Sequence, residues 1–390
     1  MITVAQALDA LFALVAPLPT EDVPLGQAHG RVLARDVMAR RTQPPFAASA
    51  MDGYAVQAAG LTSGMILTVI GESAAGHRFD GAVATGQAVR IFTGAPLPEG
   101  ADRVIIQEDV SRDGDTISLH GNLDTATHIR PAGGDFAEGT PLTAPRLLGP
   151  NDIALLAAMN VATVPVTRKP VVAIIATGDE LVQPGESPGP DQIIASNSHG
   201  LAALLAQHGA TPRLLPIARD THESLSLAFR LAADADLIVT IGGASVGDHD
   251  LVAAAADRQG MDRAFYKVAM RPGKPLMAGR IGTAAMIGLP GNPVSAMVCG
   301  HVFLLPVLRR MQGLGDAPAP RRTAALTHAL GPNGPRAHYM RAVLDGDSVT
   351  VFDRQDSALL SVLAQANALV VRPTEDAARR AGDRVDVIAL

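Results

Sequence analysis

Residues 284–296 read AAMIGLPGNPVSA, a stretch that predicts a strand, a tight loop and the start of a helix. The first six residues are apolar without polar alternation, which is typical of a strand buried on both faces of a sheet. Two prolines and two glycines then stand within residues 288–293. Pro293 suits the first position of a helix, where its missing N–H costs nothing, and Asn292 suits the cap. The stretch therefore predicts one βα unit of an α/β layer.

Two further apolar runs, VVAIIA (171–176) and DLIVTI (236–241), have the same unalternating pattern, with helical segments between the runs. Each run is followed by a loop rich in glycine and polar residues, TGDEL after the first and GGASVGDHD after the second. The carboxyl ends of parallel strands lie at one edge of a sheet, where open α/β sheets bind ligands. We therefore expect all three loops to converge on a single site.

These loops combine carboxylates with groups that bind anions. Carboxylates suit a hard cation such as Mg²⁺, whereas glycine N–H groups and a helix N-terminus suit phosphate. The carboxylates are Asp179, Glu180, Asp248 and Asp250, and the cations come from RPGKP (271–275) as Arg271 and Lys274. The expected backbone cradle comprises Gly178, Gly242, Gly243, Pro290, Gly291, Asn292 and Pro293. The combination predicts a site for a phosphate ester with a metal ion.

The two cations are expected to supply most of the attraction for an anion. A helix terminus contributes only about 0.3 to 1 kcal/mol to a nearby exposed charge. A unit charge pair at about 4 Å contributes about 4 kcal/mol at an effective dielectric constant of about 20. Each loop alone also fits a plain structural reading, TGDEL as a strand-to-helix turn and RPGKP as a solvated surface turn.

Composition narrows the class of protein. The chain has 390 residues, 47% of them apolar, which predicts more than one folded domain. A net charge of −6 and an aromatic content of 3% argue against nucleic-acid binding. The single cysteine, Cys299, fits a reducing compartment, and no run is long enough for a membrane span. We expect a cytoplasmic protein that binds neither nucleic acid nor membrane.

The remaining chain is mostly β-rich. The N-terminus shows the spacing of an amphipathic helix, and turn signals recur up to about residue 145, with a hairpin signal at Asp113-Gly114. A Pro/Gly/Ala linker (313–322) precedes a C-terminal region of alternating strand patterns.

Together, TGDEL, GGASVGDHD, RPGKP and GLPGNPVSA resemble the molybdopterin-binding domain of the molybdopterin molybdenumtransferase family, which includes the C-terminal domain of gephyrin. The segments SAMDGYAV (49–56), RIFTGAPLPEGAD (90–102) and IRPAGGDF (129–136) resemble the other hallmark segments of that family. The resemblance covers almost the whole chain.

The resemblance implies a multidomain α/β fold: a central α/β domain, elongated β-rich N-terminal domains and a small C-terminal β-barrel. Its parts would be residues 1–40 joined in space by 141–168, a β-rich insertion at 41–140, the α/β domain at 169–312, and the barrel at 321–390. The family forms homodimers with a shared active site. Its members insert molybdenum from molybdate into adenylylated molybdopterin and release AMP, with Mg²⁺ as cofactor and a molybdopterin adenylyltransferase as substrate donor.

The resemblance also implies roles for individual residues. Asp52, Thr93, Asp135, Glu180 and Asp250 match catalytic positions of the family. Lys274 matches a lysine that binds molybdate or phosphate, and Ser245 and Ser295 match the oxyanion pocket. Asp179, Glu180 and Asp250 are the expected Mg²⁺ ligands, and Asp52 or Asp135 would orient the water that releases AMP. Two alternatives stay open: an enzyme that adenylylates molybdopterin, and a non-catalytic scaffold with the same fold.

Overall fold

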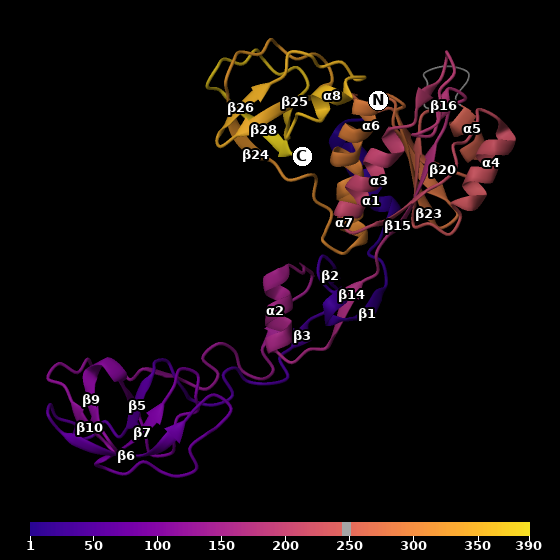
Figure 1. The fold of residues 1–390 in the computed structure, drawn as a ribbon. Coiled ribbons are helices and arrows are strands. Elements are labelled where there is room, and N and C mark those ends of the chain that lie inside the picture. The colour runs from indigo at the N-terminus through magenta and orange to yellow at the C-terminus, as the bar shows by residue number, and fades with distance from the viewer. Residues whose placement is uncertain (244–250) are drawn as a thin grey trace.

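The computed structural model describes residues 1–243 and 251–390, which form an elongated molecule (Figure 1). A β-rich group of strands lies at one end, and an α/β layer and a small barrel lie side by side at the other. A smaller sheet with helix α2 lies between the two ends. The predicted multidomain α/β fold is confirmed.

The middle sheet joins segments from both sides of the β-rich insertion. Its strands follow the order β1-β14-β2-β13, with β1 and β14 antiparallel from Thr20 opposite Thr167 to Pro24 opposite Thr163. Leu33, Leu156 and Val164 are buried between this sheet and α2. The elements are β1 (Thr20–Pro24), η1 (Leu25–Gln27), β2 (Val32–Leu33), β3 (Val37–Met38), β12 (Pro141–Leu142), β13 (Arg146–Leu147), α2 (Pro150–Ala158) and β14 (Thr163–Thr167).

The first helix, α1 (Val4–Leu14), begins with a capping box between Thr3 and Gln6. The predicted amphipathic helix is confirmed, because Leu8 and Leu11 are buried on one face. That face packs in the core of the α/β layer and not in the middle sheet. The expected N-terminal part, residues 1–40, is therefore divided in space.

The β-rich end is a six-stranded sheet in the order β8-β5-β7-β6-β10-β9. The Asp113-Gly114 hairpin signal is confirmed, since Asp113 pairs with Thr116 and Gly114 has φ +57°. Gly53 approaches the neighbouring strand so closely that a Cβ there would lie 2.0 Å from the Ile105 carbonyl oxygen. The elements are β4 (Ala48–Ser49), β5 (Gly53–Val56), β6 (Ile66–Ser73), β7 (Gln87–Ile91), β8 (Arg103–Ile106), η2 (Gln107–Asp109), β9 (Val110–Asp113), β10 (Thr116–Leu119) and β11 (Ile129–Arg130).

The α/β layer is a six-stranded sheet in the order β18-β15-β19-β23-β22-β20. Its central strands are the three apolar runs of the sequence, and β15, β19 and β23 pair in parallel as predicted. One buried core contains residues of α1, α3, α6 and α7, and another contains residues of α4 and α5, so helices cover both faces of the sheet. The strands are β15 (Val171–Ala176), β16 (Leu181–Val182), β17 (Ile193–Ile194), β18 (Thr211–Leu214), β19 (Leu237–Ile241), β20 (Asp262–Tyr266), β21 (Met270–Arg271), β22 (Met277–Ile281) and β23 (Ala284–Leu289). The helices are α3 (Asn197–Gln207), α4 (His222–Leu231), α5 (Leu251–Arg258), α6 (Pro293–Cys299), the π-helical turn η3 (Gly300–Leu304) and α7 (Leu305–Met311).

Within the described residues, Pro293–Met311 is the one helical run with the length and hydropathy of a membrane span. Its most apolar window is 72% buried inside the fold, and core helices of soluble proteins meet the same criterion.

The C-terminal region is a closed five-stranded barrel, as predicted. The strands follow the order β25-β26-β24-β28-β27, and a β25–β27 pairing closes the ring. β21 of the α/β layer adds to β25 in parallel, so the barrel is attached beside the loop that precedes β22. The elements are β24 (Arg322–Leu326), β25 (Ala337–Asp345), β26 (Ser348–Val351), α8 (Leu360–Leu363), β27 (Ala368–Arg372) and β28 (Arg384–Ala389).

Candidate active site

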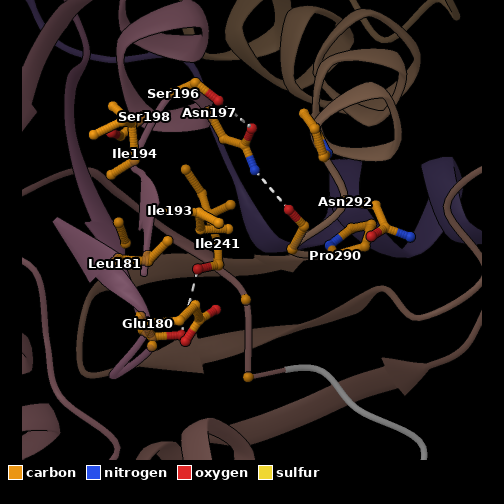
Figure 2. A pocket seen from close by; sticks show the side chains of 18 of the residues that line it. Glu180, Leu181, Ile193, Ile194, Ser196, Asn197, Ser198, Ile241, Pro290 and Asn292 are labelled. Atoms are coloured by element: carbon orange, nitrogen blue, oxygen red, sulfur yellow. Dashed lines mark hydrogen bonds between the residues drawn. The ribbon is translucent and has the colours of Figure 1, made fainter. Parts of the chain in front are cut away.

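The loops after β15, β19 and β23 lie at one edge of the sheet and line a cavity of about 690 Å³ (Figure 2). This volume falls in the usual range for small-molecule sites, about 300 to 1,000 Å³. The expected site residues that line the cavity are Gly178, Glu180, Gly242, Gly243, Pro290, Gly291, Asn292 and Pro293. Among the described residues, Asp179, Arg271, Lys274 and Ser295 lie outside this lining. Ser245, Asp248 and Asp250 lie outside the described residues.

Glycine is required where the first two loops meet. Gly242 has φ +96°, and a Cβ at this position would lie 2.7 Å from the Thr177 carbonyl oxygen. The two backbones therefore touch without an intervening side chain. The Gly242 N–H donates to the Leu289 carbonyl oxygen at 3.1 Å, so this close approach also ties the second loop to β23.

The GLPGNP loop is held from two sides. The Asn197 side-chain amide, at the start of α3, donates to the Gly291 carbonyl oxygen at 2.7 Å (Figure 2). The predicted helix start at Pro293 is confirmed, but the Asn292 side chain makes no capping hydrogen bond. The Asn292 amide instead donates to the Ser357 hydroxyl of the barrel region at 3.0 Å.

Ser357 belongs to a loop that extends from the barrel to the cavity. The Val294 N–H donates to the Ser357 carbonyl oxygen at 3.0 Å, and the next residue, Ala358, lines the cavity. Arg341, only 1% exposed, holds this loop by donating to the Gln355 side-chain oxygen and the Leu359 carbonyl oxygen. Burial lowers the pKa of Arg341, although its guanidinium stays protonated at neutral pH. The barrel therefore places a cation behind this wall.

The RPGKP loop lies between the cavity and the barrel. Arg271 is exposed and pairs in register with His338 of β25, whereas Pro275 reaches the cavity lining. Burial, and then the charges of Arg271 and neighbouring arginines, lower the pKa of His338 to about 4. His338 is therefore neutral at pH 7, and the positive charge at this junction comes from arginine.

Two acidic residues, Glu180 and Asp220, line the cavity, and Asp179 lies beside them. Asp220 has a raised pKa, first because of burial and then because of the negative charges of Asp179 and Glu180. The Asp220 N–H donates to Asp179 Oδ1 at 3.2 Å, and Arg219 donates to the Asp179 carbonyl oxygen at 2.8 Å. The only described contact between Asp220 and Asp179 thus uses the backbone of Asp220, and the carboxylates repel one another.

Asp52 and Thr93 meet at the β-rich end of the molecule, although 41 residues separate them in sequence. The Thr93 N–H and hydroxyl both donate to Asp52 Oδ1, at 2.7 and 2.8 Å. These two hydrogen bonds, with a smaller contribution from the charge of Arg90, hold the pKa of Asp52 below its usual range. Asp135 is exposed and lies a few residues after β11 in the sequence. No described hydrogen bond or ion pair joins it to Asp52 or Thr93.

The Asp52–Thr93 pair and the α/β cavity do not form one site within a single chain. Asp52 follows β4 and precedes β5 in the β-rich group, which lies at the far end of the molecule from the α/β layer (Figure 1). The structure therefore divides the expected catalytic residues into two distant sets.

Family models match nearly the whole chain. The MoeA N-terminal region (domain I and II) matches residues 2–160, the probable molybdopterin binding domain matches 173–310, and the MoeA C-terminal region (domain IV) matches 323–390. The chain belongs to the MoeA family. The family predicted from the sequence motifs is confirmed.

Relatives of this MoeA family chain are similar over their full lengths. The molybdopterin molybdenumtransferase 2 of Mycobacterium tuberculosis is 39% identical over 94% of both chains. The molybdopterin molybdenumtransferase of a Nostoc species is 35% identical over 100% of this chain and 94% of its own. A crystal structure of the molybdopterin biosynthesis MoeA protein from Pyrococcus horikoshii superimposes with a TM-score of 0.86, at 28% identity over 100% of both chains.

Two further residues of this MoeA family chain, one lining the cavity and one beside it, are not indicated by its sequence motifs. Asp220 fits the cap of a helix in sequence, but Thr221 caps α4 by accepting the Ser224 N–H at 3.2 Å, which leaves the Asp220 side chain at the cavity. Its position shortly after β18, at the same edge of the sheet, is the only indication that the sequence offers. Ser357 had no signal, because only the packing of the barrel brings it to Asn292.

Proposed function

We propose that this chain is a molybdopterin molybdenumtransferase that inserts molybdenum from molybdate into adenylylated molybdopterin and releases AMP. The observation that carries the proposal is the cavity at the ends of β15, β19 and β23, with an acidic cluster on one wall and exposed backbone on another. The names of the relatives support the reaction, and their matches run through the β-rich and barrel regions as well as the α/β layer.

The two walls have different tasks in this proposal. Gly243 and Gly291 line the cavity and would bring backbone N–H groups to the oxyanions. The N–H groups of Gly178, Gly242 and Val294 already donate to carbonyl oxygens and would shape the wall instead. Lys274 and Arg271 add positive charge from the RPGKP loop, and Arg341 adds it from the barrel. The substrate would therefore lie with its anionic groups between the GLPGNP loop and the acidic wall.

Mg²⁺ is the proposed counter-ion of the acidic wall. Within the described residues no group of three or more His, Cys, Asp and Glu side chains is arranged to hold a metal ion by itself. The pKa of Asp220 is raised first by burial and then by the negative charges of Asp179 and Glu180, which supports a site where a cation would be favourable. Mg²⁺ commonly takes one or two carboxylates and completes its shell with phosphate oxygens and water. Asp179 and Glu180, with Asp250, would hold the ion, which would neutralise the charge that develops on the pyrophosphate.

The active protein is proposed to be a homodimer with composite sites. The support is the distance between the two catalytic sets, because one chain cannot bring Asp52 to its own cavity in this arrangement (Figure 1). A second copy would supply Asp52 and Thr93 to the cavity of the first. Ionised and fixed by two donors, Asp52 is suited to orient the water that releases AMP. A molybdopterin adenylyltransferase is the proposed donor of the substrate, and the cytoplasm is the proposed location.

Release of AMP tests the reaction. The purified protein is given adenylylated molybdopterin, Mg²⁺ and molybdate, and AMP is followed by chromatography. We expect AMP to appear only when molybdate is present, with molybdenum bound to the product. AMP formed equally without molybdate would refute coupled insertion. Synthesis of adenylylated molybdopterin from ATP would instead favour the adenylyltransferase, and substrate binding with no turnover would favour the scaffold.

Mixing two inactive variants tests the composite site. Asp52→Asn and Glu180→Gln each damage one half of the site, so heterodimers contain one site with both halves intact. We expect the mixture, after subunit exchange, to recover up to about half of the activity of a wild-type dimer per heterodimer. The matched control mixes Asp52→Asn with Thr93→Val, which lie in the same half and should not complement. Failure of the first mixture despite proven exchange would contradict the shared site.

A further inference from the structure

Arg90 lies between two aromatic rings beside the Asp52–Thr93 pair. Arg90 on β7 stands opposite Tyr54 on β5, and its Cζ lies 5.1 Å from the centroid of the Tyr54 ring. The same atom lies 4.7 Å from the centroid of the Phe92 ring. Both distances are within the range of cation–π interactions, and a planar guanidinium is well suited to such stacking. Arg90 therefore contacts the neighbours of both catalytic residues, because Phe92 precedes Thr93 and Tyr54 is two residues after Asp52.

The hydrogen bonds of Arg90 also connect it to the backbone around Asp52. Its Nη1 donates to the Gly53 carbonyl oxygen at 3.3 Å, directly after Asp52. Its Nη2 donates to the Gln107 side-chain oxygen at 2.8 Å, and the Gln107 N–H donates to the Asp52 carbonyl oxygen at 3.0 Å. One guanidinium thus connects β5, β7 and the turn after β8, the three segments that hold Asp52 and Thr93 in place.

No carboxylate neutralises Arg90 among the described ion pairs. Glu72 is its register neighbour on β6, and Glu108 accepts a hydrogen bond from the Gln107 side chain at 3.3 Å, but no described ion pair joins either acid to Arg90. The adjoining segments also carry Asp109 in the turn after β8 and Arg103 on β8, and the Arg103 guanidinium pairs with Asp124 at 3.6 Å. Arg90 keeps its positive charge next to Asp52, where that charge favours the ionised carboxylate.

We propose that Arg90 is a positioning residue, which fixes the orientation and the charge of the Asp52–Thr93 pair without touching substrate. The proposal rests on the proposed function for its catalytic consequence. The guanidinium acts through three neighbours: the stacked Phe92 orients Thr93, and the contacts to Gly53 and Gln107 fix the backbone of Asp52. Small displacements of a catalytic group are costly, since about 1 Å can reduce a rate about 100-fold.

The test compares Arg90→Gln with Arg90→Lys and with a matched control. Arg112→Gln removes an arginine from β9 of the same sheet, whose Nε donates to the Gly114 carbonyl oxygen at 3.0 Å, on the edge strand away from β5. The first readout is the pKa of Asp52, measured by ¹³C NMR of labelled aspartate and assigned by the signal lost in Asp52→Asn. The second is the division of the effect between kcat and KM for AMP release.

We expect Arg90→Gln to raise the pKa of Asp52 and to lower kcat about 10- to 100-fold, with KM within about twofold. Arg90→Lys, which keeps the charge but not the planar fork, should restore the pKa and part of kcat. Arg112→Gln should change neither. If Arg90→Gln does not fold, Phe92→Leu removes one ring of the stack and should change kcat in the same direction by a smaller factor.

An unchanged pKa of Asp52 in folded Arg90→Gln overturns the proposal, and so does a shifted pKa with unchanged kcat. A loss of kcat shared by Arg112→Gln also overturns it, because that result would indicate general damage to the sheet. The NMR titration needs no turnover. If the chain does not catalyse the proposed reaction, the effect of Arg90→Gln on the pKa of Asp52 can still be measured. Failure of the proposed function can therefore be distinguished from failure of the proposed role of Arg90.

Discussion

At the β-rich end of the molecule Asp52 accepts two hydrogen bonds from Thr93, whereas at the α/β cavity Asp220 lies near two other acids. The pKa of Asp52 is lowered because Thr93 donates twice to one of its oxygens, and the pKa of Asp220 is raised by burial and by the charges of Asp179 and Glu180. Both aspartates lie at proposed functional sites, and their surroundings shift their pKa values in opposite directions.

The difference assigns different roles to the two groups. A carboxylate that already has its donors gains little from a cation and can act on a water molecule from a fixed position. At the cavity the Arg219 guanidinium donates to backbone carbonyl oxygens, and no described ion pair joins it to the carboxylates, so a divalent ion would offset their mutual repulsion. Within one chain the two groups lie at opposite ends of the molecule (Figure 1). In the proposed homodimer, Asp52 of one chain would face the acidic cluster of the other.

The largest expected effect comes from removing the charge at the β-rich end. Asp52→Asn keeps the size and the acceptor for Thr93 but loses the negative charge, so AMP release should fall about 100-fold or more. The thermal midpoint should change little, because the side chain is not buried. The measurements are a steady-state assay and a thermal melt. A rate within threefold of wild type would remove Asp52 from the mechanism.

The pH dependence of Asp52 follows from the direction of its pKa shift. Because its pKa lies below the ordinary value of 3.8, Asp52 stays ionised down to pH values under 3.8. Its stabilising contribution is present above the unfolded value and is lost as the pH falls through the lower, folded value. An acid limb in the rate profile near neutral pH must therefore come from another group, which Asp52→Asn would confirm by leaving the position of that limb unchanged.

The next expected effect is on the scaffold under Asp52. Gly53→Ala places a Cβ 2.0 Å from the Ile105 carbonyl oxygen. Because this oxygen belongs to the backbone of the neighbouring strand, it cannot move aside without distorting the sheet. We expect the β-rich sheet to lose about 2 to 4 kcal/mol of unfolding free energy. Hydrogen exchange of residues 53–56 measures this locally. Gly121→Ala in the same region, with its nearest contact at 3.7 Å, is the control and should cost less than about 0.5 kcal/mol.

The sequence predicted the cavity better than it predicted the residues in it. The apolar runs, the loops that follow them and the helix start at Pro293 are local patterns, and the parallel sheet brings them together by geometry alone. The sequence alone does not decide whether Asp220 or Thr221 caps α4, because both residue types are good caps, and only the backbone of Thr221 and its bond to Ser224 settle it. Ser357 reaches Asn292 through the packing of a barrel some 65 residues away, which no local pattern encodes.

A smaller effect is expected at the acidic wall. Asp220→Asn removes one of the repelling charges, so the protein without Mg²⁺ should be as stable as wild type or more stable, by less than about 1 kcal/mol. Mg²⁺ should then bind less tightly, with a half-saturating concentration for AMP release about tenfold higher and a smaller Mg²⁺-induced rise in melting temperature. A lower stability without Mg²⁺ would contradict the view that these acids repel one another.

The smallest expected effect comes from Gly178→Ala, which would change the position of the Glu180 carboxylate without changing any charge. At Gly178, φ is +146° and a Cβ would lie 2.3 Å from the Glu180 Oε2 atom. Unlike the Ile105 carbonyl at Gly53, this obstacle is the flexible end of a side chain, which can swing away. Gly178→Ala should therefore cost about 1 kcal/mol of backbone strain and move the Glu180 carboxylate while keeping every charge. We expect Mg²⁺ half-saturation to rise only a few-fold, less than in Asp220→Asn. An effect as large as that of Asp52→Asn would mean that the acids of the cavity are positioned as strictly as the Asp52–Thr93 pair, and the contrast between a fixed end and an adaptable end would not hold.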